Sequence, residues 1–384
     1  MERDFPRYYD LKYNVSVASP KDVQKKVLNR DAALIEYVLG EREIFIFTIT
    51  PTSFDVATVP KDSLLNKRIE DLRRGIVEKD FTLYTENAHA LYEQLIAPVS
   101  ESLRVRNLII VPDGNLSYVP FEALLTSEVD PRRVKDYRTL PYLIDRFAIS
   151  YAYSATLLLE TQKRERTEPE KDYLAFAPVF AGGLPVGSRG RDLLEANGKA
   201  ANQRSARSLG YLPMTRTEVT GILKLFKEQY GWFDRLFSGK AQVYLEEEAA
   251  ETAVKNSDLS AYRYLHFATH SFANTENPEA SGIVLYPDDF GSSDEAAGEK
   301  RGDIEDIGED GVLRLGEVYN LELNADLVVL SACETGLGPV ARGEGILSLT
   351  RGFLYAGASN VLVSLWSAED VQTSTLMQSF YRHM

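Results

Sequence analysis

The sequence has 384 residues, and its 57 acidic and 43 basic side chains give it a formal net charge of −14. This acidic balance argues against nucleic acid as an obligate partner, because phosphate binding needs a basic surface. With a single cysteine, no secretory leader and no apolar run of the ~18 residues that span a bilayer, the chain is expected to work in a reducing, cytoplasmic compartment without membrane contact.

The first half of the chain is predicted to be an α/β layer. Residues 1–30 form an entry segment with a short helix over residues 20–29, and residues 31–160 form the layer itself. Apolar runs bounded by turn residues predict extended segments over residues 32–39, 44–49, 54–59, 108–111 and 142–152. Helical spacing of apolar residues predicts helix between residues 61 and 103. No pair of a nucleophile and a base stands out in this half.

The second half, residues 173–384, follows a charged linker over residues 161–172 and is predicted to be another α/β layer. Buried-strand runs lie at residues 173–177, 243–245, 262–270, 281–286, 327–330 and 361–365. Amphipathic segments predict helices over residues 217–230 (with Thr217 as N-cap), 246–257, 345–357 and 370–382. Residues 181–211 and 288–311 are predicted to be long loops, and the second is acidic and Gly-rich.

Cys333 follows the apolar run 327–330 at the point where glycines end the predicted strand. Side chains at the carboxyl end of a parallel strand open onto a crevice. His270 ends another strand-like run and is therefore expected at the same edge of the sheet. A cysteine and a histidine placed there can come within hydrogen-bond reach, which is the geometry of an activated thiol. The alternative is a packed, unreactive cysteine.

Other kinds of site are weakly supported by the residues. His266 and His270 have the i, i+4 spacing of two metal ligands on a helix, but the run between them reads as strand. The chain also offers no second thiol and no HExxH glutamate. The glycines after Cys333 lack the ending of a P-loop, and a G-x-S-x-G elbow is absent. We therefore expect no metal and no cofactor, and we interpret His89 and His383 as surface residues.

Two motifs in the second half resemble those of a known family. They are His266-Phe267-Ala268-Thr269-His270 and Leu330-Ser331-Ala332-Cys333-Glu334-Thr335-Gly336. The stretches Ile110 to Gly114 and Val119 to Leu124 are similar to the N-terminal half of the same family. The resemblance covers residues 31–384 and is to the CHAT family of caspase-like and separase-like cysteine peptidases.

The resemblance implies both a fold and a dyad. The fold is α/β and caspase–hemoglobinase-like, with two three-layer α/β/α halves: an inactive pseudo-caspase half over residues 31–160 and a protease half over residues 173–384. His270 is then the general base and Cys333 the nucleophile. A backbone N–H at Ser271 is a candidate for the oxyanion hole.

The resemblance also implies a substrate pocket, whose candidate residues are Trp366 and Asp370. An acid at position 370 would favour a basic residue before the scissile bond. The competing interpretation is that Asp370 caps the helix that follows it, and we favour this cap.

The sequence departs from the family pattern in three respects. Ser271 stands where the family usually has glycine, and its Cβ narrows the approach to the oxyanion hole. Loops 181–211 and 288–311 are longer than usual, which makes them candidates for self-cleavage. The chain stops at Met384, where the family normally continues with further helix and strand, so either the chain is trimmed or its last layer is missing.

Two functions are consistent with these features. The first is a cysteine endopeptidase that carries out regulated, limited cleavage of a protein partner in bacterial defence or programmed cell death. The resemblance implies a gasdermin-like substrate and a helical-repeat activator as partners. The second is a catalytically silent scaffold or interaction module of the CHAT type, which the Ser271 departure and the early end favour.

Overall fold

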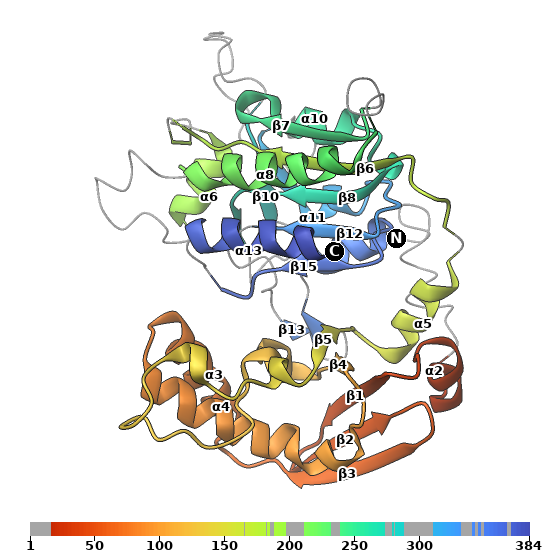
Figure 1. The fold of residues 1–384 in the computed structure, drawn as a ribbon, viewed down its shortest axis with the longest axis vertical. Helices are drawn as coiled ribbons and strands as arrows, with labels where there is room; N and C mark the ends of the chain where they lie inside the picture. Colours follow the sequence, from red (N-terminus) through yellow and green to blue (C-terminus); the bar gives the residue numbers. More distant parts are fainter. Residues whose placement is uncertain are drawn as a thin grey trace, which may run out of the picture. The chain divides into compact units, whose positions relative to one another are not determined.

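The computed structural model divides the chain into two compact units, which are described separately (Figure 1). The first unit comprises residues 1–165 and 340–346, and the second comprises residues 166–339 and 347–384. The structure describes residues 17–164, 166–181, 183–184, 188–196, 211–231, 239–272, 279, 281–287, 310–331, 340–341, 345–346, 349–366 and 370–384. Within this part of the chain, no helix has both the length and the apolar character needed to cross a membrane.

The first unit is built on a five-stranded sheet of order β3-β2-β1-β4-β5. The first three strands form antiparallel pairs, whereas β1, β4 and β5 run parallel to one another. The strands are β1 (Ala32–Leu39), β2 (Glu43–Ile49), β3 (Phe54–Pro60), β4 (Asn107–Val111) and β5 (Ala148–Tyr151).

Helices cover both faces of this sheet, as the alternation of buried side chains along a strand requires. Ala33, Ile35 and Tyr37 of β1 face one core, which α3 (Leu65–Val77) and α4 (Phe81–Leu95) complete. Leu34 points to the opposite face and joins a smaller core under α2 (Pro20–Lys26) and α5 (Ala155–Lys163). Short 3-10 turns connect the remaining segments, among them η1 (Ala97–Ser102) and η2 (Gly114–Tyr118).

The second unit is built on a parallel sheet of order β15-β12-β8-β6-β7. In chain order its strands therefore run 2-1-3-4-5, which is one of the two common doubly wound arrangements. The strands are β6 (Lys171–Ala177), β7 (Ala241–Leu245), β8 (Tyr262–Phe267), β12 (Leu327–Leu330) and β15 (Val361–Val363). Their apolar runs are expected for strands that are buried on both faces.

Two layers of helices enclose this sheet. One face packs on α8 (Pro213–Gln229) and α13 (Asp370–His383), which lie side by side across the strands (Figure 1). The other face packs on α10 (Glu251–Asn256), α11 (Leu315–Val318) and α12 (Leu349–Ala356). The second unit is thus a three-layer α/β/α arrangement, and the predicted α/β fold class is confirmed at this level.

Two small antiparallel sheets complete the fold. The first has the order β11-β10-β9 and consists of β9 (Ser271–Phe272), β10 (Gly282–Val284) and β11 (Val312–Arg314). It continues the chain directly after His270. The second is the hairpin of β13 (Val340–Ala341) and β14 (Gly345–Ile346), which belongs to the first unit and lies against η2.

Several predicted boundaries are wrong, each for a local reason. The predicted loop 181–211 contains α6 (Arg189–Ala196). The helix predicted from Thr217 begins instead at Pro213, because proline is well suited to a first helical position, and Thr217 lies inside it. Residues 345–346 form a strand, so the helix predicted over residues 345–357 begins only at Leu349.

Candidate functional site

The candidate site lies at the carboxyl edge of the parallel sheet of the second unit. The chain leaves β6 for β7 on one side and later returns to β8 on the other, so the strand order reverses between β6 and β8. Ligands of open α/β sheets bind at such a switch point, outside the carboxyl ends of the strands. His270 follows β8 directly at this edge.

The strand register relates His270 to the position of Cys333. Leu330 of β12 pairs with Phe267 of β8, and the Ser331 N–H donates to the Phe267 carbonyl at 2.9 Å. His270 comes three residues after Phe267, and Cys333 comes three residues after Leu330. The structure describes the chain as far as Ser331, so Cys333 itself lies outside the described residues.

His270 is half-buried, and the strand β10 holds the backbone beside it. The Val284 N–H donates to the His270 carbonyl at 2.8 Å, and the Thr269 hydroxyl donates to the Val284 carbonyl at 2.5 Å. Thr269 is 2% exposed, so its hydroxyl gains little from water and a protein partner counts for more. The strand predicted over residues 262–270 ends at Phe267. Beyond it, these two hydrogen bonds hold Thr269 and His270 against β10.

An aromatic side chain from the end of β6 supports the imidazole. The rings of Phe180 and His270 stack with centroids 6.2 Å apart and planes 20° apart. Val179 and Phe180 both have positive φ, at 58° and 52°, a conformation that is costly for bulky residues. This strained turn brings a ring that is 1% exposed under His270 at the switch point.

Behind the sheet edge, His266 is part of a buried polar cluster. Its Nε2 lies 2.8 Å from Glu218 Oε1 of α8, and its Nδ1 lies 3.2 Å from the Tyr381 hydroxyl of α13. His266 and Glu218 are 0% and 1% exposed. Burial, followed by the Glu218 charge, raises the pKa of Tyr381 well above its usual range. His266 therefore links β8 to α8 and α13, on the face of the sheet that these two helices cover.

Ser271 begins β9 and is fully buried. It pairs with Ile283 of β10, and the bond from Val284 N–H to the His270 carbonyl makes this a non-hydrogen-bonded pair. The Ser271 N–H is consequently directed away from β10. Its side chain adds a Cβ and a hydroxyl in a space that solvent does not reach.

Comparison with known proteins identifies the family. The CHAT domain matches residues 85–384, well over half of the chain. This chain belongs to the CHAT-domain family. The resemblance inferred from the two motifs is thereby confirmed, and the family is related to caspase-like peptidases.

Two curated relatives are similar to this chain. Tetratricopeptide repeat protein 28 of Mus musculus is 27% identical over 322 residues, and that of Homo sapiens is 25% identical over 318 residues. Each alignment covers 76% of this chain and 11% of the relative. The chain thus spans about a tenth of the length of the curated relatives it matches.

The two predicted pocket residues of this CHAT domain lie beyond β15. Trp366 is half-buried, and Asp370 begins α13. The Asp370 carboxylate accepts the Met214 N–H at 2.9 Å and therefore caps α8. The sequence favours a cap on α13, the helix that begins at Asp370. Burial raises the pKa of Asp370, and the nearby Glu218 charge raises it further, against the effect of the Met214 bond.

Sequence reasoning missed Phe180 and Glu218 in this CHAT domain. Glu218 could have been recognised from the sequence, because it lies next to Val219 and one turn before Ile222 on the buried side of α8. An acid inside an apolar stripe predicts a buried partner. Phe180 could not have been recognised in this way, since only the tertiary fold brings the end of β6 under His270. Among the described residues, no three His, Cys, Asp or Glu side chains gather as a metal site.

Proposed function

We propose that this CHAT domain is a cysteine endopeptidase with a dyad of His270 and Cys333. The observation that supports it most is the register of β8 and β12. Their paired ends lead, after the same number of residues, to a histidine at the sheet edge and to the only cysteine of the chain. His270 also lies at a switch point and stacks on the ring of Phe180, whose backbone is strained, and such strain clusters at functional sites.

The proposed reaction needs only these two side chains and water. The Cys333 thiolate attacks the scissile carbonyl carbon, and the resulting tetrahedral intermediate collapses as the His270 imidazolium gives its proton to the leaving amine. The acyl group then remains as a thioester on Cys333. Water loses a proton to His270 and attacks the thioester, which releases the new carboxyl end and returns the proton to the dyad.

We further assign the oxyanion hole and the substrate pocket. The Ser271 N–H is directed away from β10 and is the proposed donor to the developing oxyanion. Trp366 and Asp370 are the proposed pocket residues, with Asp370 favouring a basic side chain in the substrate. The bond from Met214 to Asp370 competes with this role, because the carboxylate already accepts a backbone N–H.

The wider proposal follows the family. Residues 31–160 form a pseudo-caspase half and residues 173–384 a protease half, joined by the linker 161–172. The substrate is a protein, for which a gasdermin-like pore-former is our proposal, and the activator is a helical-repeat protein or segment. The names of the curated relatives agree with a repeat partner. Residues 181–211, which include α6, and residues 288–311 are the proposed cleavage sites, and most of both segments lies outside the described residues.

A catalytically silent scaffold is the second candidate. The buried Ser271 favours it, because its Cβ occupies space beside the proposed oxyanion hole. A scaffold would keep the fold and the buried cluster around His266 while needing no reactive thiol.

One experiment separates the two functions. Because Cys333 is the only cysteine, iodoacetamide labelling of the folded chain reports on this thiol alone. The rate is measured from pH 5 to 9 for the wild type, for His270→Ala and for His383→Ala as the matched control. A peptidase predicts fast labelling at neutral pH that His270→Ala abolishes and His383→Ala leaves unchanged. Slow labelling that follows an ordinary thiol titration in all three proteins would identify a scaffold.

A further inference from the structure

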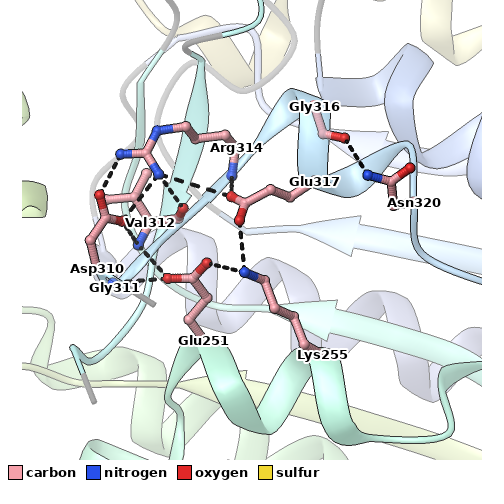
Figure 2. A network of polar contacts seen from close by, with 9 residues as sticks. All are labelled: Glu251, Lys255, Asp310, Gly311, Val312, Arg314, Gly316, Glu317 and Asn320. Carbon is pink, nitrogen blue, oxygen red and sulfur yellow. Dashed lines mark hydrogen bonds and ion pairs between the residues drawn. The ribbon is translucent and has the colours of Figure 1, made fainter. Parts of the chain in front are cut away.

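A second set of charged groups contacts the start of β11, in the small sheet β11-β10-β9 (Figure 2). At its centre is Glu251, the first residue of α10, which is only 1% exposed. One carboxylate oxygen accepts the backbone N–H groups of Gly311 and Val312 at 2.9 and 3.2 Å. The other oxygen lies 2.7 Å from the Lys255 ammonium.

The remaining members of the network hold Glu251 in place. Lys255 also reaches Glu317 of α11 at 2.7 Å, and Glu317 accepts the Arg314 N–H at 2.7 Å. The Arg314 guanidinium in turn pairs with Asp310 through both of its terminal nitrogens (Figure 2). A buried carboxylate with three donors in such a frame has little freedom to move.

The backbone of Gly311 is shaped to meet this carboxylate. Its φ is +82°, and a Cβ at this position would come within 3.0 Å of Pro287. Gly311 also accepts the Leu285 N–H at 2.8 Å through its carbonyl. The chain around residue 311 is thus tied to Glu251 by its N–H and to the end of β10 by its C=O.

The strand β10 connects this network to His270. Val312, which donates to Glu251, is the register partner of Val284. Val284 is the residue that donates to the His270 carbonyl and accepts the Thr269 hydroxyl. Only the two paired valines therefore separate the carboxylate of Glu251 from the backbone that carries the imidazole.

We propose that Glu251 is a positioning residue for His270, acting through the backbone of β11 and β10. The inference rests on the proposed function for its catalytic meaning, because it assigns Glu251 the task of aligning the base of that dyad. Glu251 touches neither the substrate nor the reacting atoms. Its carboxylate fixes β11, β11 fixes Val284, and Val284 fixes the turn from Thr269 to His270.

The test compares Glu251→Gln with Glu248→Gln. The first variant keeps the size of the side chain, but its single oxygen cannot serve both the β11 amides and Lys255. Glu248 is exposed on the turn before α10 and provides the matched control. Glu251→Asp is a second variant, which keeps the charge but withdraws it from β11. Folding of each variant is checked by a cooperative melt and by the ring signals of His89 and His383.

Three local readouts then decide the proposal. In Glu251→Gln and Glu251→Asp we expect faster amide exchange at Val312 and Val284, a shifted ring signal of His270, and Cys333 alkylation at neutral pH slowed by about tenfold to a hundredfold. In Glu248→Gln we expect no change. The His270 signal is assigned with the His270→Ala variant.

The outcomes keep the two proposals apart. Faster exchange at Val312 with an unchanged His270 signal would overturn the positioning role, since the effect would end at β11. An alkylation rate that does not depend on His270 would overturn the dyad. The amide and ring signals would still show whether Glu251 positions His270.

Discussion

The two units share a layered construction but differ at the carboxyl edge of their parallel strands. Each has a central sheet between two layers of helices and a set of parallel strands with their carboxyl ends at one edge. In the first unit, Asp113 closes this edge after β4 by accepting the Leu39 N–H at the end of β1 at 2.7 Å. In the second unit the corresponding edge carries His270, which is bonded to β10 through its carbonyl and stacked on Phe180 of a strained turn.

The buried polar groups differ in the same way. Among the described residues, the buried acidic or basic side chain of the first unit is Asp71, which pairs with the exposed side chains of Lys67 and Arg74. The second unit buries Glu218, Glu251, His266 and Arg351. Burying such groups costs free energy that apolar residues would not cost. Among the described residues, these costly groups are concentrated in the second unit.

The comparison predicts its largest effect for the histidines of the two units. His270→Ala is expected to lower cleavage of a protein substrate by about a hundredfold to ten-thousandfold, the usual contribution of a general acid–base group. His89→Ala, in the first unit, is expected to leave the rate unchanged. Rates are measured with the activated protein, and equal losses in both variants would contradict the contrast between the units.

The second prediction concerns stability. Glu218→Ala removes the buried partner of His266 and is expected to lower the free energy of unfolding by about 3 kcal/mol. Asp71→Ala removes an acid that pairs with exposed cations, so we expect a much smaller loss than for Glu218→Ala. Urea unfolding of both variants at pH 7 measures the difference. A larger loss for Asp71→Ala would reverse our interpretation of the two cores.

The third prediction is a pH dependence that arises from Glu251. Burial raises the pKa of this carboxyl from 4.5 to about 7, against the effect of the Lys255 bond. The folded state therefore binds more protons than the unfolded chain between these values, and the associated stability is present below pH 4.5 and lost as the pH rises through about 7.

This pH dependence is measured as a difference between two proteins. Unfolding free energies of the wild type and of Glu251→Gln are determined from pH 4 to 8. The wild type is expected to lose stability relative to the variant as the pH rises. Parallel curves would mean that Glu251 titrates in the folded state as it does in the unfolded chain.

The smallest predicted effect tests the edge of the first unit. Asp113→Ala removes the acceptor of the Leu39 N–H and is expected to destabilise the protein by about 1 kcal/mol. Labelling of Cys333 by iodoacetamide should keep its wild-type rate. A slowed rate would show that this edge of the first unit influences the thiol.

The amino-acid sequence by itself determined the elements and the family. Apolar runs such as residues 32–39 and 327–330 predict buried strands because their length and branched side chains suit little else. The motifs around His270 and Cys333 have a fixed local spacing, so the family could be inferred without a fold. Element boundaries were less certain, as α6 and the start of α8 illustrate, because propensity yields to packing at the ends of helices.

Only the tertiary structure decided which side chains meet. His266 and Glu218 are 48 residues apart, and their contact depends on α8 lying across β8. The ring of Phe180 reaches His270 because β6 and β8 are neighbouring parallel strands, so the segments that follow them lie side by side. Asp370 caps α8 because α13 runs beside that helix. Such contacts join layers, and a linear pattern records the face of each residue but not the partner that the opposite layer will provide.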